Sequence, residues 1–149
     1  MSGERMSPHL QHTMVETLGI KMFRDENGVF KATMPVDSRT CQIFGLLNGG
    51  ASVALAENLA GFASFELCEK DTIPVGSSVS ANHVAPGFFN SEVHAVATPV
   101  KIGKTVHIWN VDVFNEKEQL LSTIRMTNLI IKDTHNLREA IINASVDKN

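Results

Sequence analysis

The sequence predicts an α+β domain in which one long central helix is wrapped by a curved antiparallel sheet of five to six strands. The first observation is one long apolar helix candidate, residues 48–68. The second is that four stretches in the second half of the chain are rich in Val, Ile, Thr and Phe and are separated by short turn signals. Wrapping such strands around one helix buries the apolar residues of both halves.

The segment before this helix is expected to contain a short helix and a hairpin. Residues 8–17 are the candidate opening helix, and residues 18–23 and 29–35 are the candidate strands. The turn 25–28 between them contains an Asn-Gly pair, which favours a tight hairpin. Residues 36–47 have no regular pattern and are expected to be irregular.

The long helix has apolar or small residues on every side, which is typical of a buried helix. In the second half, alternation places Trp109, Val111 and Val113 on one face of a strand and Asn110 on the other. This pattern indicates an antiparallel meander with one face better buried. The predicted strands are 75–86, 90–101, 104–114 and 119–132, and a short helix is expected at 137–142.

Composition favours one domain, over residues 1–149, with its core at about 18–132 and a polar tail at 133–149. The net charge of −3 argues against nucleic acid as a partner. No charge-free apolar run reaches the ~18 residues of a membrane span, and no signal peptide is expected. Cys41 and Cys68 form no CxxC pair, so we expect reduced thiols in a cytoplasmic protein.

Glu57 is the candidate catalytic carboxylate, because it lies between apolar residues inside the long helix. A charged carboxylate in such surroundings is costly unless it is paired or solvated in a cleft. Burial also raises the pKa of a carboxyl group toward the range that suits a general base or nucleophile. The alternative is that Glu57 simply reaches solvent at the edge of the helix.

Asn48, Gly49 and Gly50 begin the long helix. Asn is a favoured N-cap residue, so a plain helix start explains the motif. The same geometry suits catalysis, because two residues without side chains let a ligand approach backbone N–H groups at the positive end of the helix dipole. Such groups stabilise a developing oxyanion during acyl transfer.

The other polar candidates are less specific. His83 lies in a predicted strand, where a lone histidine is more often structural than catalytic. The histidines and cysteines lack metal-ligand spacing, so neither a metal nor a cofactor is expected. Ser52 and Ser64 lack the Gly-x-Ser-x-Gly context of a serine hydrolase. Lys101 and Lys104 flank a turn and are candidates for binding a phosphate.

Several blocks of the chain resemble the hotdog acyl-CoA thioesterases. The central block runs from Ala32 to Glu57 and includes Phe44-Gly45-Leu46-Leu47-Asn48-Gly49-Gly50; further matches are 81–84, Pro99 and Trp109. The likeness is strongest to enzymes of the phenylacetyl-CoA thioesterase-like group that hydrolyse 1,4-dihydroxy-2-naphthoyl-CoA. The resemblance implies a hotdog fold and hydrolysis of an aromatic or medium-chain acyl-CoA.

The resemblance also implies roles for individual residues. Glu57 would attack the thioester or activate water, and the N–H of Gly49 would bind the thioester oxygen. Gln42 would help to orient the reacting groups, and His83 and Gly50 would lie near the bound acyl-CoA. Their positive charge, apart from the resemblance, makes Lys101, Lys104 and Arg125 the expected partners of the CoA phosphates.

Three residues depart from the family pattern. Asn48 replaces the His of a His-Gly-Gly motif, so the side chain cannot titrate near neutral pH. Gly61, which is expected to border the substrate, replaces a Ser or Thr one turn after Glu57, so a hydroxyl is missing. Ala85 replaces an Arg of the most similar branch, which removes one expected CoA contact.

Helix geometry predicts a dimer. Gly49 and Glu57 are eight residues apart, or about 12 Å at ~1.5 Å per residue, which is more than a Glu side chain spans. If both serve one active site, Glu57 must come from a second subunit whose helix runs antiparallel to the first. The expectation is a two-fold homodimer with shared sites, and further a homotetramer.

The sequence leaves three functions open. An acyl-CoA thioesterase is the leading hypothesis. A non-catalytic acyl-CoA-binding hotdog protein is the alternative, which Asn48 and Gly61 favour. A hydratase or dehydratase is the weakest, because the helix that contains Glu57 matches the thioesterase branch.

Overall fold

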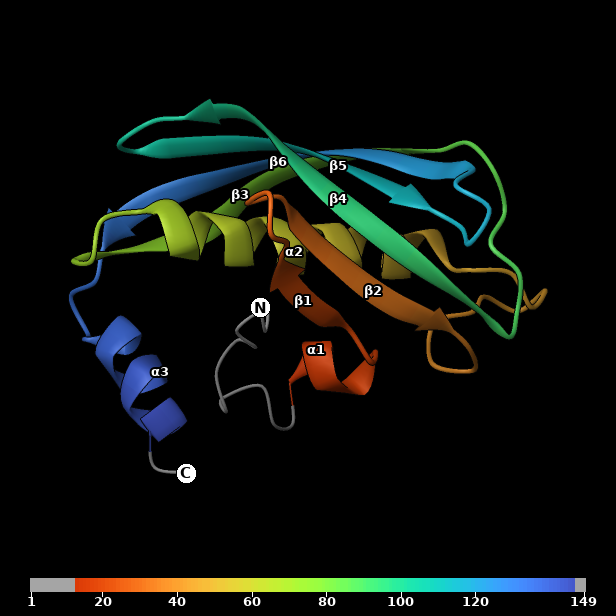
Figure 1. Ribbon diagram of the computed structural model, residues 1–149, viewed down its shortest axis with the longest axis horizontal. Coiled ribbons are helices and arrows are strands. Elements are labelled where there is room, and N and C mark those ends of the chain that lie inside the picture. The colour runs from red at the N-terminus through yellow and green to blue at the C-terminus, as the bar shows by residue number, and fades with distance from the viewer. Residues whose placement is uncertain (1–12, 147–149) are drawn as a thin grey trace.

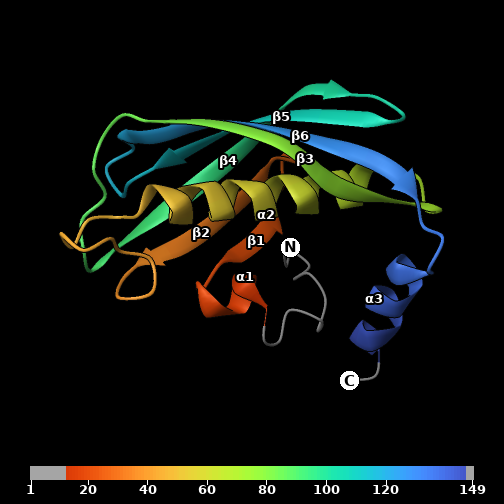
Figure 2. The same cartoon turned by 180° about the vertical axis from the view of Figure 1, so that it is seen from behind.

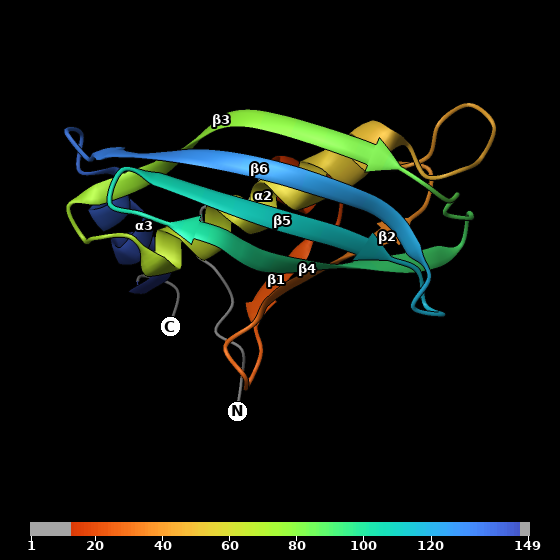
Figure 3. The same ribbon diagram turned by 90° about the horizontal axis from the view of Figure 1, so that it is seen from above.

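The computed structural model describes residues 13–146, in which one long helix lies along one face of a six-stranded antiparallel sheet (Figure 1). The strand order is β1-β2-β4-β5-β6-β3. The elements are α1 (Met14–Thr17), β1 (Lys21–Arg24), β2 (Phe30–Val36), α2 (Gly49–Leu67), β3 (Thr72–His83), β4 (Ser91–Ile102), β5 (Val106–Phe114), β6 (Leu120–Lys132) and α3 (Leu137–Val146). The sheet curves over α2 (Figures 2 and 3), so the predicted architecture is confirmed.

The observed elements differ from the predicted ones mainly at their ends. Of the opening helix expected at 8–17, the part after Thr13 forms α1, and residues 8–12 lie outside the described residues. The strand expected at 75–86 ends at His83, because the N–H groups of Val84 and Ala85 both turn to one carbonyl, that of Leu121, and the regular ladder does not continue.

The predicted alternation of buried and less buried side chains along β5 is present, and its buried side chains form part of the core. Trp109, Val111 and Val113 are buried on the inner face of the sheet, and Trp109 contacts the ring of Phe30 edge-on, with centroids 5.8 Å apart. Apolar residues of β2, β4 and β6 lie on the same face and pack against α2. The core therefore lies between the concave face of the sheet and the helix.

The helix itself is buried on one side only, which differs from the expectation that it is enclosed all round. Leu55 and Leu59 are fully buried under the sheet, whereas Gly50 and Glu57 are exposed. The reason is geometric, since one sheet covers one side of a helix. The small residues on the other side of α2 are thus left available to a further layer.

The hydroxyl of Ser64 helps to join α2 to the middle of the sheet. The Oγ of Ser64 accepts hydrogen bonds from Trp109 Nε1 at 2.8 Å and from Asn128 Nδ2 at 3.0 Å, and it lies 3.0 Å from Nδ1 of His107. The two donated bonds occupy both lone pairs of the hydroxyl, so its hydrogen points to His107. All four side chains are buried, and this network has no unsatisfied atom.

At the C-terminal end, α3 is held by Arg138. Its guanidinium lies over the Phe65 ring, 3.9 Å from the centroid, and donates to the carbonyls of Phe65 and Thr72. The predicted helix at 137–142 is therefore present, and it extends to Val146. These contacts join the polar tail to the last turn of α2.

Two classes of site are not seen in residues 13–146. No helix there is long and apolar enough to cross a membrane. Within the same residues, no cluster of three or more His, Cys, Asp or Glu side chains is arranged to hold a metal ion.

We expect the buried imidazole of His107 to make the protein acid-sensitive. Desolvation lowers the pKa of His107 from its ordinary value of 6.5, and a backbone hydrogen bond to Gly103 opposes this only in part. The unfolded chain therefore binds a proton that the folded chain does not bind when the pH falls below about 6.5. The free energy of unfolding, measured by urea titration, should fall by up to about 1 kcal/mol between pH 6.5 and 5.5.

The control replaces one histidine at a time. His107→Gln should flatten the pH dependence in this window, whereas His135→Gln, at an exposed position, should leave it unchanged. The carboxyl groups whose pKa values are lowered by ion pairs, such as Asp71 beside Lys132, contribute only at lower pH. An equal slope in both variants would contradict the role given to His107.

Candidate active site

The first turn of α2 presents one unused backbone donor. The Oδ1 of Asn48 accepts from the N–H of Gly50 at 2.8 Å, as expected of an N-cap, and the carbonyl of Asn48 accepts from Ala51 and Ser52. The N–H of Gly50 is therefore not free for a ligand, although the sequence had suggested both glycines. Among the described residues, no hydrogen-bond partner is found for the N–H of Gly49.

His83 packs directly against this turn. A Cβ atom at Gly49 would lie 2.6 Å from Nε2 of His83, so a larger residue there would push the imidazole from its place. The other ring nitrogen, Nδ1, lies 2.7 Å from the hydroxyl of Ser122 on β6. The structure thus brings together two residues that the sequence had singled out, Gly49 and His83, at the positive end of the α2 dipole.

Glu57 lies two turns further along α2, and it is exposed rather than buried. Its Oε1 lies 2.8 Å from the position that a Cβ would take at Gly76 on β3. The helix and the edge strand therefore approach closely enough to hold the carboxylate against the strand backbone. Within residues 13–146, no ion pair of this carboxylate is found.

Within one chain, Glu57 and Gly49 do not meet. Glu57 lies beside Gly76 and Gly49 lies beside His83, and those two strand residues are roughly 20 Å apart along β3. The carboxylate and the free N–H are therefore two separate halves of a site on the same side of α2, the side that faces β3.

The loop before α2 contains Gln42. Its side-chain oxygen accepts from the N–H of Phe44, and its N–H donates to the carbonyl of Leu46 at 2.8 Å, so the side chain closes its own turn. The tip of this turn is strongly exposed, with Ile43 at 93% and Phe44 at 81%. Two large apolar side chains so close to the helix start are suited to contact with another molecule or subunit.

A pocket of about 500 Å³ opens on the other side of the helix start, between α2 and α1. Its wall is mostly apolar, and Arg39, which is paired with Asp37, stands at its polar edge. The lining residues are Met14, Thr17, Leu18, Arg39, Thr40, Cys41, Asn48, Gly50, Ala51 and Ala54. The pocket is therefore adjacent to the N-terminus of α2.

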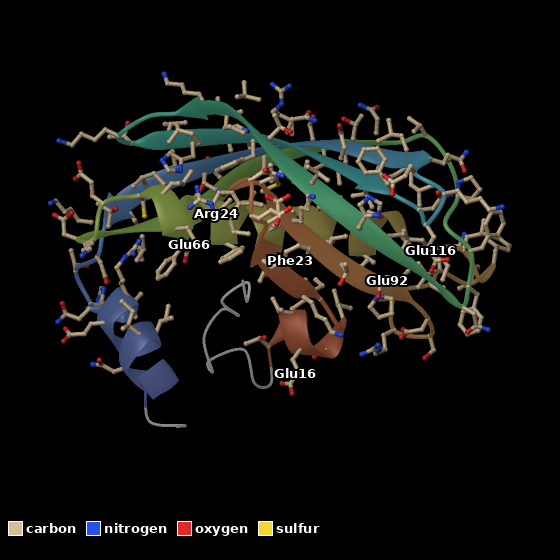
Figure 4. All side chains as sticks on the ribbon, viewed as in Figure 1. Glu16, Phe23, Arg24, Glu66, Glu92 and Glu116 are labelled. Atoms are coloured by element: carbon tan, nitrogen blue, oxygen red, sulfur yellow. The ribbon has the colours of Figure 1, made fainter. Side chains whose placement is uncertain are left out.

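Charge differs between the two ends of the sheet. Glu92 and Glu116 lie at the end near the start of α2 (Figure 4), where the carboxylate of Glu116 accepts from the N–H of Glu92. Lys101 and Lys104 lie at the opposite end, where the β4–β5 turn is located. The structure does not place these lysines beside Gly49 of the same chain. Lys104 is instead near Asp71, the residue directly before β3.

Two residues of the site were missed by the sequence analysis. Gly76 could have been suspected, because a glycine inside a strand often marks a bulge or a close backbone approach, and the β3–β6 register does shift next to it. Ser122 gave no local signal, since its contact with His83 depends on strand register.

Comparisons with known proteins identify the family of this chain. The model of the thioesterase superfamily matches residues 44–122, which include the start of α2, Glu57, His83 and Ser122. The chain belongs to the thioesterase superfamily. It is therefore a thioester hydrolase by family, and its fold and enzyme class agree with the resemblance found in the sequence.

Individual relatives of this superfamily cover most of the chain. The 1,4-dihydroxy-2-naphthoyl-CoA hydrolase of Escherichia coli is 39% identical over 79% of this chain and 86% of its own length. The proofreading thioesterase EntH of Klebsiella pneumoniae is 38% identical, over 81% and 88%. The crystal structure of a Haemophilus influenzae thioesterase superposes with a TM-score of 0.80 at 35% identity, over 87% and 91%.

We expect Gly61 to limit both the stability of α2 and the rate of hydrolysis. A Cβ at Gly61 would meet nothing within 4 Å, so a side chain fits there, one turn after Glu57. Gly61→Ala should raise the free energy of unfolding by about 1 kcal/mol, because Ala is the better helix former. Gly61→Ser should raise kcat above that of Gly61→Ala, because it adds a hydroxyl beside the carboxylate. A serine variant no faster than the alanine variant would contradict this.

Proposed function

We propose that the protein hydrolyses acyl-CoA thioesters, with Glu57 as the reacting carboxylate and the N–H of Gly49 as the oxyanion donor. The observation that carries the proposal is the free N–H of Gly49 at the start of α2. A thioester oxygen gains negative charge as its carbonyl is attacked, and a donor at a helix N-terminus stabilises that charge.

The carboxylate of Glu57 then has two routes. It attacks the carbonyl carbon directly and forms a mixed anhydride that water hydrolyses, or it takes a proton from a water molecule that attacks instead. In both, the carbon–sulfur bond breaks, the sulfur leaves with a proton as the CoA thiol, and the oxygen of water ends in the free acid. Either route needs Glu57 close to the oxygen held by Gly49.

A second subunit can supply that proximity. A two-fold rotation that places Glu57 of one subunit beside Gly49 of the other has its axis near Val53, which lies halfway between them on α2. For the same rotation to place Gly76 of one subunit beside His83 of the other, its axis must pass near Val79, which lies halfway between them on β3. One axis that passes both valines brings Glu57 of each subunit to Gly49 of the other.

The surface around this axis supports such a dimer. β3 is an edge strand of twelve residues with no Asp, Glu, Lys or Arg, and Val79 on its helix side is 44% exposed. Long edge strands without charge are open to pairing with another strand. Strand pairing along β3 would also cover the half of α2 that the chain leaves exposed.

The outer face of the sheet supports a further association of dimers. Val75 of β3 and Leu129 and Ile131 of β6 are each more than two-fifths exposed and lie next to one another by strand register. We propose that this patch joins two dimers into a tetramer.

The pocket between α1 and α2 is the proposed place for the acyl group. Its volume and its apolar residues, among them Met14, Leu18 and Ala54, suit an aromatic or medium-chain group. In the proposed dimer the CoA phosphates lie toward Lys101 and Lys104 of the subunit that supplies Glu57, since that end of the sheet is basic and the other acidic.

A second candidate function is acyl-CoA binding without turnover. It is favoured by Gly61, where no hydroxyl accompanies the carboxylate, and by Asn48, which cannot transfer a proton near neutral pH. Release of free thiol from a panel of aromatic and medium-chain acyl-CoAs separates the two functions, because a binding protein releases none.

The catalytic role of Glu57 is tested by Glu57→Ala. Thiol release should fall by at least about 100-fold, because the carboxylate is the group that reacts. Thermal unfolding should be unchanged or occur at a slightly higher temperature, because the side chain is exposed and Ala favours the helix. Glu66→Ala, at an exposed glutamate of the same helix, is the matched control and should stay within twofold of the wild type (about the assay's resolution). Activity near that of the wild type in Glu57→Ala would exclude Glu57.

The shared site is tested by mixing inactive subunits. Glu57→Ala and Gly49→Pro, which removes the free N–H and also displaces His83, should each be inactive. Co-refolded in equal amounts, they should recover about a quarter of wild-type activity, because about half of the dimers are mixed and each has one intact site. No recovery would mean that both residues act from the same chain.

The reverse mixture is the control. A chain that carries both substitutions, co-refolded with an equal amount of wild type, should leave about a quarter of the activity if sites are shared. It should leave about half if each chain holds its own site, because the wild-type chains then act independently.

A further inference from the structure

Ser122 is a buried polar residue of β6 that lies beside His83. It lies on β6 directly opposite His83 of β3, and paired residues of antiparallel strands project to the same face. Only 2% of Ser122 is exposed. Within residues 13–146, the contact with Nδ1 of His83, at 2.7 Å, is the one hydrogen bond found for its hydroxyl.

The direction of this hydrogen bond follows from burial. If Nδ1 carried the proton and donated it to Ser122, the hydrogen of the buried serine hydroxyl would have no acceptor among the described residues. Leaving such a buried group without a partner destabilises the folded protein. The hydroxyl therefore donates to Nδ1, and a neutral imidazole then carries its proton on Nε2.

The nitrogen that carries the proton is the one beside the helix start. Nε2 lies against Gly49, 2.6 Å from the position of a Cβ there, and the N–H of Gly49 is free. An N–H on Nε2 and the N–H of Gly49 would both serve an acceptor at this end of α2. A bare Nε2 would instead repel the thioester oxygen.

We propose that Ser122 is a positioning residue that holds His83 in its Nε2–H form, so that His83 is a second donor to the thioester oxygen beside Gly49. The inference rests on the proposed function, because it assumes that the oxygen is bound at the start of α2. The hydroxyl acts through the imidazole and does not contact substrate.

The tautomer of His83 can be measured by NMR without following hydrolysis. In the wild-type protein with ¹⁵N-labelled histidine, two-bond ¹H–¹⁵N spectra near pH 8 should show His83 with the proton on Nε2, and Ser122→Ala should show a mixture of both tautomers. Ser122→Thr keeps the hydroxyl and should restore the wild-type pattern. A proton on Nδ1 of His83 in the wild type would overturn the proposal, whatever the enzyme hydrolyses.

Kinetics then separate positioning from simple packing. Ser122→Ala should lower kcat about tenfold with little change in KM, because one donor to the oxyanion is misaligned. In a His83→Ala background the same substitution should have no further effect on kcat. An equal loss in both backgrounds would show that Ser122 matters only for packing. Ser80→Ala, on the exposed outer face of β3, is the matched control and should leave kcat unchanged.

Different results would contradict the catalytic role of Glu57 and the positioning role of Ser122. If Glu57→Ala remains active but His83 shows the Nε2–H tautomer and loses it in Ser122→Ala, the proposed mechanism is wrong and the positioning of His83 stands. If Glu57→Ala is inactive and Ser122→Ala is as fast as the wild type, the mechanism stands and the role of Ser122 is wrong.

Discussion

The hydroxyl of Ser64 sets the position of α2, and the site depends on that position. It bonds at once to side chains of β5 and β6, so the helix can neither slide along the sheet nor rotate without breaking a buried network. Glu57 lies two turns earlier on nearly the same side of the helix. The bonds that orient Ser64 toward the sheet therefore also direct Glu57 toward β3.

Missing side chains complete this arrangement. Gly49 leaves room for His83 and Gly76 leaves room for the carboxylate of Glu57, so the flank where α2 meets β3 holds polar groups that a Cβ would displace. The two contacts lie at separate points along that flank, and each contains half of the chemistry expected of a thioesterase. A two-fold partner is the simplest way to join a donor from one helix to a carboxylate from another.

Several features of the fold and of the helix start were predictable from local sequence patterns. Asn48 was recognised as an N-cap because its type and place before an apolar helix are sufficient evidence, and the structure has that cap. The buried face of β5 followed from the alternation around Trp109. The burial of Glu57 was predicted wrongly for the single chain, because apolar neighbours along a helix do not say which side the sheet covers. Ser122 and Gly76 were missed because their partners come from other elements.

The sequence by itself determined the order of elements, the helix start and the presence of a carboxylate in an apolar helix, because these depend on hydrogen bonding and side-chain direction within a few residues. The tertiary structure alone decided which groups face one another. His83 meets Ser122 through strand register across 39 residues, and Ser64 meets Trp109 across 45. The first pair forms only in this register of β3 and β6, since a shift of one residue would turn each side chain to the opposite face, and the second forms only when the sheet packs over the helix.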